Sequence, residues 1–247
     1  MSPPPQPNAA GTPRVSVVMP AYNEAEAIAS AIEEVRVEVL DRLPRAELIV
    51  VDDGSTDATG RIADGIAAHD PRIRVVHQPN AGHGGALMTG MDAASGAFLL
   101  LVDSDRQIAL SAFPAAWAEV ERGRDGVFGV RRRRHDPALR LQLTRWVRAA
   151  IRLLFGVRLH DANVPFKLLR REIWLDAKRA IPPGTLAPSL FLAVYALRRG
   201  RDIQEMDIEH RPRDTGEVSI QRLKLLTFCW RGLRQLVAFR RGLNDAG

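Results

Sequence analysis

The chain is short of cysteine, and this scarcity excludes two kinds of structure. Cys229 is the single cysteine among 247 residues, so no internal disulfide framework can form. A zinc site built on several cysteines is excluded too, and any bound metal must use oxygen or imidazole ligands. A chain without disulfides fits a reducing compartment, so we expect a cytoplasmic protein.

Long apolar runs are also missing. No stretch approaches the roughly 18 uninterrupted apolar residues that mark a membrane-spanning helix, because even the apolar segment 223–239 is broken by Lys224, Arg231 and Arg234. Residues 1–13 are rich in Pro and Ala and lack the order of a signal peptide, so we expect a disordered tail there. Any contact with a membrane is therefore expected to be peripheral, at its inner face.

Aromatic residues are scarce, at 6%, whereas basic residues outnumber acidic ones and give a net charge of +6. The surplus predicts an anionic partner, which could be nucleic acid, a membrane surface or a phosphorylated substrate. Few aromatics and the lack of a recognition motif argue against nucleic acid. The length suits one large α/β domain or two small ones.

Short apolar runs alternate with segments of helical spacing through residues 14–130. The runs are rich in Val, Ile and Leu, as strands buried on both faces are. They lie at residues 15–19, 48–51, 73–76 and 98–102. Helical spacing marks residues 24–40 and 56–68. This alternation predicts an α/β fold with a mostly parallel sheet flanked by helices, and ligands at the carboxyl ends of the strands.

Two amphipathic segments follow, at residues 137–155 and 219–241. Each has an apolar stripe, and in the first segment Arg145, Arg148 and Arg152 fall on a neighbouring face. The stripe residues are Leu139, Leu143, Trp146, Ala150 and Leu154 in the first segment and Leu223, Leu226, Trp230, Leu233 and Val237 in the second. We expect both stripes to pack on the rest of the domain, with contact to anionic lipid headgroups as the alternative. For the four arginines at 131–134 we favour contact with an anion.

The sequence Asp-Ser-Asp-Arg-Gln at 103–107 directly follows the apolar run that ends at Val102. Carboxylates two residues apart at a strand end suit a hard cation such as Mg²⁺ or Mn²⁺, which shares oxygen ligands with phosphates. Asp105 and the amide oxygen of Gln107 are the predicted ligands, with Asp103 close by. A solvated acidic turn is the alternative interpretation.

Two further polar clusters follow other strands. In Val-Asp-Asp-Gly-Ser-Thr-Asp at 51–57, Gly54 permits a tight turn, and helix capping explains the Ser, Thr and last Asp. Capping does not explain consecutive carboxylates at a strand end, where Asp53 is the one we expect to accept hydrogen bonds from a base or ribose. In Pro-Ala-Tyr-Asn-Glu at 20–24, Asn23 and Glu24 suit a helix start. Pro20, Tyr22 and Glu24 suit equally the wall of a nucleotide pocket.

Glycine-rich signatures of other enzymes are absent. No Gly-x-Gly-x-x-Gly follows the first strand, which argues against a hydride-transfer enzyme. The glycine-rich segment Asn80–Gly85 lacks the Lys-Ser/Thr ending of a P-loop, so an ordinary turn with an exposed His83 is expected. The Gly-x-Gly-Thr-Arg loop of sugar-nucleotide pyrophosphorylases is missing too.

The three strand-end clusters together resemble those of the inverting glycosyltransferases of family 2, which have the GT-A fold. The Asp-x-Asp-x-Gln pattern is most similar to dolichol-phosphate mannose synthase and bacterial polyprenyl-phosphate glycosyltransferases. Later segments add to the resemblance, namely Phe128–Arg131, 154–171 and 210–216. They depart from it at Val130, where the family has Ser, and at Val164-Pro165, where Ser-Gly is usual.

The resemblance implies a GT-A Rossmann-like domain with C-terminal amphipathic helices. Residues 14–130 would bind the nucleotide sugar and 131–247 the acceptor. The diphosphate of the donor, bound to the metal, would be the leaving group. Arg131 and Arg213 would either compensate its negative charge or bind the phosphate of the acceptor. The implied catalytic residues are Asp105, Arg131 and Arg213. The implied donor-binding residues are Pro20, Tyr22, Glu24, Val51, Asp53, Asp103, Ser104, Asp105, Gln107, Arg131 and Arg213.

The acceptor is expected to be a polyprenyl or dolichyl phosphate, and the donor GDP-mannose or a UDP-sugar. A hydroxyl acceptor needs a general base, whereas a phosphate is already ionised. Family members that use hydroxyls carry a Glu-Asp pair after the fifth strand, and between Val127 and Arg170 the acids are only Asp136 and Asp161. Transfer to a hydroxyl of a saccharide or small metabolite is the alternative.

Overall fold

The first strand, β1 (Val15–Ala21), lies near the middle of a seven-stranded sheet with the order β3-β2-β1-β4-β6-β5-β7. The computed structural model describes residues 14–131, 138–161, 164–182, 184–211, 232 and 234–243, and the side chains of 138–144 are outside the description. The other strands are β2 (Ala46–Asp52), β3 (Ile73–His77), β4 (Phe98–Leu101), β5 (Gly126–Arg131), β6 (Lys167–Arg170) and β7 (Ile203–Ile208).

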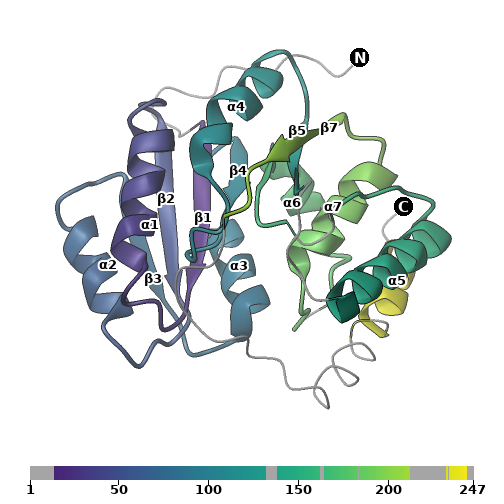
Figure 1. The fold of residues 1–247 in the computed structure, drawn as a ribbon, viewed down its shortest axis with the longest axis horizontal. Coiled ribbons are helices and arrows are strands. Elements are labelled where there is room, and N and C mark those ends of the chain that lie inside the picture. The colour runs from purple at the N-terminus through teal and green to yellow at the C-terminus, as the bar shows by residue number, and fades with distance from the viewer. Residues whose placement is uncertain are drawn as a thin grey trace.

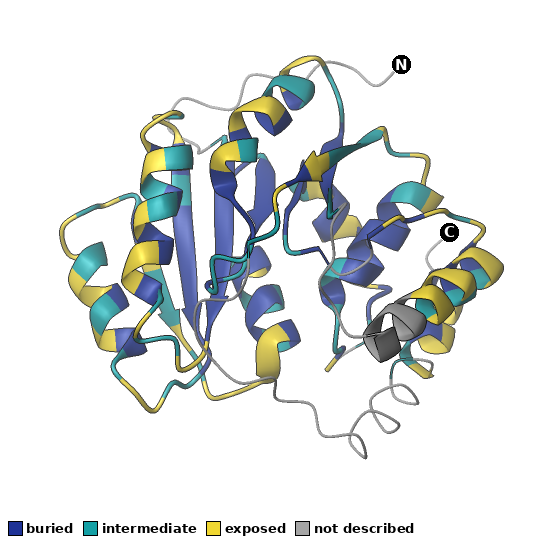
Figure 2. Cartoon of the chain, in the orientation of Figure 1, coloured by how far each residue is buried: buried dark blue, intermediate teal, exposed yellow. Residues whose placement is uncertain are grey.

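The expected mostly parallel sheet is confirmed. Strands β1 to β4 pair in parallel, and so do β5 and β7. The exception is β6, which lies antiparallel to both β4 and β5. Strands β1, β2 and β4 are buried almost throughout, which explains why the sequence shows continuous apolar runs there instead of alternation, whereas β3 is only partly buried (Figure 2).

Helices cover both faces of the sheet (Figure 1). One core contains apolar residues of α1 (Ile28–Val35), α2 (Thr59–Ala67) and α4 (Phe113–Glu121). The opposite core contains residues of α3 (Gly82–Ala93), α5 (Ala138–Phe155), α6 (Arg171–Ala177) and α7 (Pro188–Arg198). Each core joins residues from both sides of position 130, so the two predicted functional regions share both hydrophobic cores. The tail 1–13 lies outside the described residues.

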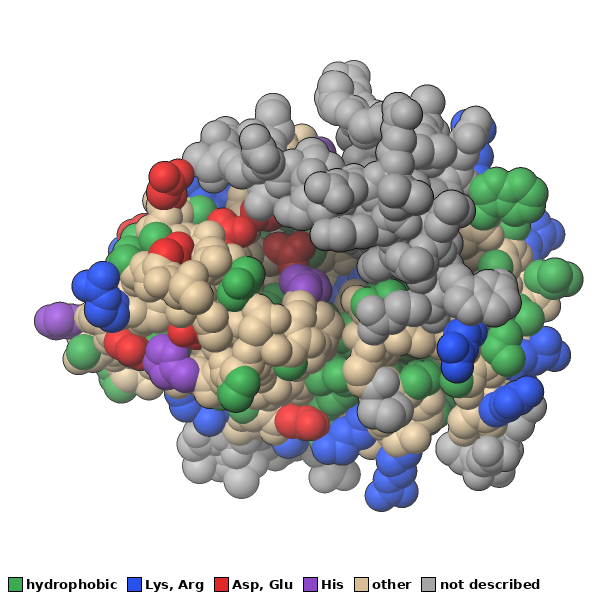
Figure 3. Space-filling model, turned by 90° about the horizontal axis from the view of Figure 1, so that it is seen from below, with side chains coloured by type: hydrophobic (Ala, Val, Ile, Leu, Met, Phe, Trp, Pro, Cys, Tyr) green, Lys and Arg blue, Asp and Glu red, His purple; other side chains and the backbone are tan. Residues whose placement is uncertain are grey.

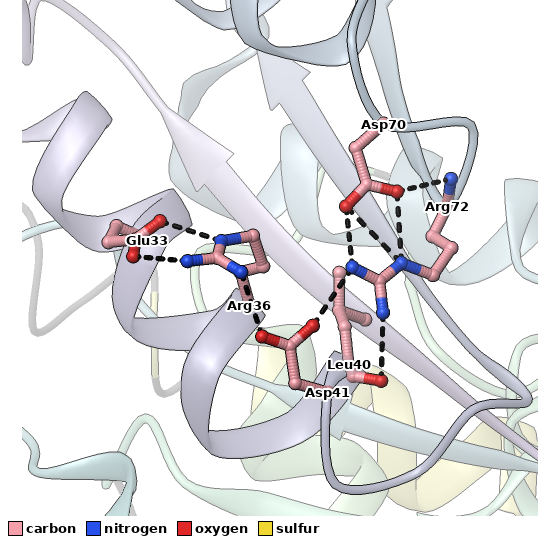
Figure 4. Close-up of polar contacts among 6 residues, drawn as sticks. All are labelled: Glu33, Arg36, Leu40, Asp41, Asp70 and Arg72. Carbon is pink, nitrogen blue, oxygen red and sulfur yellow. Dashed lines mark hydrogen bonds and ion pairs between the residues drawn. The ribbon is translucent and has the colours of Figure 1, made fainter.

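The helix predicted over 24–40 is shorter and has two parts. It begins at Ile28, and its last turn, η1 (Arg36–Leu40), is a π-helix in which the Asp41 amide donates to the Arg36 carbonyl oxygen at 2.8 Å. An ion-pair network holds this end (Figure 4). Arg72 donates to the Leu40 carbonyl oxygen at 3.0 Å and to Asp41 at 3.0 Å.

Both amphipathic segments pack on the domain, as expected, although the buried positions match the predicted stripes only in part. Among the described side chains of α5, Ile151 and Phe155 are buried, and Ala150 and Leu154 of the predicted stripe pack against the same core, whereas Trp146 is 75% exposed. In the helical residues 234–243, Phe239 packs on Phe155, with ring centroids 5.6 Å apart. Val237 is 39% exposed; the other stripe residues of that segment lie outside the described ones. Spacing alone does not show which positions of a stripe the core covers, because a helix contacts the core only where neighbouring elements leave room for it.

Among the described helices, none combines the length and the hydrophobicity that crossing a bilayer requires.

Candidate active site

The carboxyl ends of β1, β2 and β4 meet at a pocket of about 360 Å³. These strands are neighbours and parallel, so the loops that leave them emerge at the same edge of the sheet. The pocket is lined by Pro20, Ala21, Tyr22, Glu24, Asp53, Asn80, Gly82, His83, Ala86, Asp103, Ser104 and Asp105. The structure thus brings the three strand-end clusters together. From below, Figure 3 shows acidic side chains and a histidine gathered in one part of this face.

The loop after β1 is held by the loop after β2. Asn23 has a positive φ of 52°, and its side-chain oxygen accepts a hydrogen bond from the Thr56 amide at 2.8 Å. The Asn23 amide donates to the Ser55 hydroxyl oxygen at 3.0 Å, and the Ala25 amide donates to Asp57 at 3.2 Å. These hydrogen bonds between the two loops leave Tyr22 at the wall of the pocket, where it is 47% exposed.

The capping prediction for the second cluster is therefore wrong for Ser55 and Thr56. No side chain caps α2 at its N-cap residue Ala58, and Ser55 and Thr56 bond to Asn23 instead. Asn23 in turn does not cap α1, whose N-cap is Ala27. Both errors have one cause: Ser, Thr and Asn bond equally well to backbone amides of a neighbouring loop, which spacing along the chain cannot reveal.

The two adjacent aspartates of the second cluster have different roles. Asp53 is 2% exposed and lines the pocket; one of its oxygens accepts hydrogen bonds from Gln78 at 2.6 Å and from the Ala81 amide at 2.8 Å. Asp52 points away, accepting from the Ser55 amide at 3.1 Å and contacting His77 at 2.9 Å. Burial raises the pKa of Asp52, but these hydrogen bonds outweigh it and leave the pKa below its ordinary value.

Gly54 makes the tight turn between these aspartates and Ser55, which bonds to the loop after β1. Its φ is +72°, and a Cβ there would lie 2.9 Å from the Asn80 amide nitrogen. Only glycine fits both the conformation and the space.

The third cluster forms the opposite side of the pocket. Ser104 is buried, and Asp103 and Asp105 face the pocket with it. Asp105 accepts a hydrogen bond from the Gln107 amide at 3.0 Å, which closes the turn. His83 contacts Asp103 at 3.0 Å.

His83 is exposed, as expected, but it belongs to the first turn of α3 and not to a loop. Burial lowers the pKa of His83, while the carboxylates of Asp103, Asp105 and Asp53 raise it more, so the pKa lies above its ordinary value. It is the one basic residue among the described residues that line this pocket.

Three described residues of the predicted site do not line the pocket, and a fourth predicted residue is outside the description. Val51 is fully buried against α3, so any contact from it to a ligand must come from its backbone. Gln107 and Arg131 are not among the lining residues, and Arg213 lies outside the described residues. The ligand role of Gln107 and the phosphate roles of both arginines stay predictions.

Arg131 ends β5 in a two-pronged ion pair with Asp161. Its Nε and Nη2 donate to the two Asp161 oxygens at 2.8 Å and 3.1 Å. The side chains are 12% and 1% exposed, so this is a desolvated pair. Asp161 is thereby engaged in holding an arginine.

Lys167 is a residue near the site that sequence reasoning missed. It is fully buried, donates to the Val164 carbonyl oxygen at 2.6 Å, and pairs in register with Leu101 of β4, two residues before Asp103. Burial lowers its pKa to about 8, although Asp161 and Asp103 oppose the shift. The sequence feature that could have pointed to this residue is the presence of a lysine inside the apolar run from Phe166 to Leu169.

The donor set fits a hard divalent cation. Asp103 and Asp105 offer carboxylate oxygens to one pocket, and such ligands suit Mg²⁺ or Mn²⁺. The described residues hold no group of three or more His, Cys, Asp or Glu that could bind a metal alone. A cation here would therefore take its remaining ligands from elsewhere, as a cation shared with substrate phosphates does.

Comparison with known proteins identifies the family. The profile described as "Glycosyl transferase family 2" matches residues 16–184, which include all three strand-end clusters. The chain belongs to glycosyltransferase family 2. This family 2 chain is 28% identical over 214 residues to the undecaprenyl-phosphate 4-deoxy-4-formamido-L-arabinose transferase of Pseudomonas fluorescens, covering 86% of this chain and 62% of that protein. For the same enzyme of Proteus mirabilis the identity is 28%, over 88% and 66%. The chain thus spans less than two thirds of these relatives.

Solved structures show the same architecture. Glucosyl-3-phosphoglycerate synthase of Mycobacterium tuberculosis with uridine diphosphate superposes with a TM-score of 0.70 at 25% identity, covering 94% of this glycosyltransferase and 81% of that chain. Its complex with Mn²⁺, UDP-glucose and phosphoglyceric acid gives a TM-score of 0.69 at 25% identity, over 94% and 80%. The expected GT-A fold is confirmed.

Proposed function

We propose that this chain transfers a sugar, with inversion and with a divalent cation, from a nucleotide-sugar donor to a polyprenyl phosphate. The pocket that joins Asp53 with Asp103 and Asp105 carries the proposal, because it offers a contact for a nucleoside and ligands for a diphosphate-bound cation in one place. A solved relative with the same fold holds Mn²⁺ and UDP-glucose. The sequence relatives named above are undecaprenyl-phosphate sugar transferases.

The residues divide the work along the donor. Asp53 and the wall formed by Pro20 and Tyr22 would hold the nucleoside, while Asp103 and Asp105 would hold Mg²⁺ or Mn²⁺. The cation, when bound, stabilises the negative charge that develops on the leaving diphosphate. Arg131 and Arg213 would contact phosphate oxygens, for which guanidinium groups are suited.

A phosphate acceptor removes the need for a general base. One of its oxygens would attack the anomeric carbon while the bond to the donor diphosphate breaks, and the bond electrons leave with that diphosphate. No proton has to be taken from the acceptor, since a phosphate monoester is ionised at neutral pH. The pairing of Asp161 with Arg131 supports this proposal, because a carboxylate held in a buried ion pair is poorly placed to serve as a base.

Donor and metal are tested by ligand-induced stabilisation. UDP, GDP and their sugar conjugates, each with and without Mn²⁺, should raise the melting temperature more the more tightly they bind. Asp105→Ala should lose the metal-dependent part of the rise, whereas Asp176→Ala, an exposed carboxylate on α6, should keep it. A full metal-dependent rise in the Asp105 variant would contradict the ligand assignment.

A second candidate acceptor is a small phosphorylated metabolite that is glycosylated on a hydroxyl. The structural likeness to glucosyl-3-phosphoglycerate synthase favours it. Labelled donor sugar incubated with undecaprenyl phosphate or 3-phosphoglycerate distinguishes the two, because the lipid product partitions into organic solvent. Label found only in water-soluble product would overturn the lipid-phosphate proposal.

The outer face of α5 supports a peripheral membrane contact. Trp146 and Leu153, one heptad apart, are 75% and 85% exposed. Beside them a basic pocket of about 540 Å³ is lined by Arg145, Arg148, Ala149, Arg152, Val157, Arg158, Leu159 and His160. Basic and apolar side chains lie next to one another at the right of Figure 3, the side on which Figure 1 shows α5. Exposed apolar groups among arginines suit an anionic lipid surface, where each arginine contributes about 1 kcal/mol.

Sedimentation with vesicles tests this contact. The protein should bind vesicles that contain phosphatidylglycerol more than vesicles of phosphatidylcholine, and less in high salt. Trp146→Ser with Leu153→Ser should weaken binding, whereas Leu175→Ser, another exposed apolar residue on α6, should not. Equal losses in both variants would refute a specific role for α5.

A further inference from the structure

Glu34 of α1 joins three segments around the acidic turn that follows β4. One carboxylate oxygen accepts hydrogen bonds from the Leu110 amide at 3.2 Å and from Arg211 at 3.1 Å. The other accepts from Arg106 Nε at 3.3 Å. The Glu34 side chain is 13% exposed, and a small cavity beside it is also lined by Asp103 and Asp105. The glutamate therefore lies directly behind the predicted metal ligands.

Arg106 needs such a partner because its backbone is strained. Its φ is +56°, a region that residues with a side chain rarely adopt. Arg106 lies between Asp105 and Gln107, so its backbone conformation determines where those two side chains point. Strained residues persist where surrounding contacts hold them, and the described contact of the Arg106 side chain is the ion pair with Glu34.

The same turn is held from a second side by residues 209–211. The Arg211 amide donates to the Gln107 carbonyl oxygen at 2.8 Å, and the Ala109 amide donates to the Glu209 carbonyl oxygen at 3.4 Å. Ile108 and His210 form a β-bridge. Since Arg211 also contacts Glu34, the glutamate ties the acidic turn and this late segment to one point on α1.

We propose that Glu34 is a positioning residue that holds the 103–107 turn in its metal-binding shape through Arg106, Leu110 and Arg211. The proposal rests on the proposed function, because it assumes that Asp103 and Asp105 bind a cation together with a donor diphosphate. Glu34 is not among the residues that line the donor pocket, so it acts through the turn. Its loss should weaken cation binding without removing a ligand.

The test compares Glu34→Gln with Glu33→Gln. The neighbouring Glu33 pairs with Arg36 at 2.6 Å, in the network of Figure 4, and makes the control on the same helix. Mn²⁺ is titrated in the presence of the nucleoside diphosphate that stabilises the wild type. Glu34→Gln should raise the Mn²⁺ concentration at half-saturation about tenfold, as expected for losing charge-assisted hydrogen bonds. Glu33→Gln should leave it unchanged.

Hydrogen exchange gives a readout that needs no metal. Amides at 105–111 should exchange about tenfold faster in Glu34→Gln than in Glu33→Gln, because their protection depends on this anchor. If the wild type shows no metal-dependent binding, the proposed function fails, and the exchange result alone decides whether Glu34 holds the turn. Equal exchange in the two variants overturns the proposal.

A rescue separates positioning from a general loss of stability. Glycine adopts positive φ without strain, so Arg106→Gly in the Glu34→Gln background should restore most of the Mn²⁺ affinity. A double variant that binds Mn²⁺ as weakly as Glu34→Gln alone would show that strain at Arg106 is not what Glu34 offsets, and would overturn the proposal.

Discussion

Replacing Asp161 by asparagine should lower the free energy of unfolding by more than the loss of any exposed ion pair would. The substitution keeps the shape of the side chain but removes the negative charge that faces the Arg131 guanidinium, whose side chain is only 12% exposed. Breaking a buried pair by removing one partner costs about 3 kcal/mol or more. Urea denaturation followed by tryptophan fluorescence should show the midpoint lower by about 1 M, taking a slope of about 3 kcal/mol per M.

A matched pair shows that burial, not distance, sets this cost. Arg201 and Glu172 also lie 2.8 Å apart, but their side chains are 27% and 55% exposed. Glu172→Gln should therefore cost about 0.5 kcal/mol or less. Arg131→Met combined with Asp161→Leu should recover most of the loss, because neither partner of the pair is then left buried without the other. If Asp161→Asn shifts the midpoint no more than Glu172→Gln, the reasoning from burial is refuted.

Two further perturbations test the loop after β2. Hydrogen bonds with Asp52 and Asp64 raise the pKa of His77 above its ordinary value, so the protonated ring stabilises the fold below pH about 6.5, and this contribution is lost as pH rises through the raised pKa. His77→Gln should therefore lose more stability relative to wild type at pH 5.5 than at pH 9. The two losses in free energy of unfolding should differ by about 0.5 kcal/mol, a small value because the ring is half exposed. Equal losses at both pH values would contradict this expectation. Gly54→Ala should cost about 1–2 kcal/mol in urea denaturation, because a Cβ would meet the Asn80 amide at positive φ, and a neutral result would show that the turn can rearrange.

The strands of residues 14–130 and the place where their polar clusters meet could be predicted from sequence, because the signals for them are local. Each of the strands β1 to β4 appeared as an apolar run, and each polar cluster followed its own strand within a few residues. Parallel neighbours then bring Asp53 and Asp103 to the same sheet edge by geometry alone. No knowledge of distant contacts was needed to expect this edge.

The remaining features depend on contacts between distant segments. Spacing could not show that Ser55 holds Asn23 or that Asp161 pairs with Arg131. Lys167 escaped notice because a charged residue inside an apolar run contributes nothing to a periodic pattern. The α5 stripe was assigned to Trp146, but which face of a helix is covered depends on the elements that reach it from elsewhere in the chain.

The antiparallel insertion of β6 bears on how the protein is made. β4 gains its second neighbour, and β5 its first, only when Lys167–Arg170 arrives between them. During synthesis the ribosome must therefore deliver the chain as far as Arg170 before the middle of the sheet can close, and until then β4 presents an open hydrogen-bonding edge. Nascent chains whose synthesis stalls before β6 is complete would be the ones most prone to aggregate.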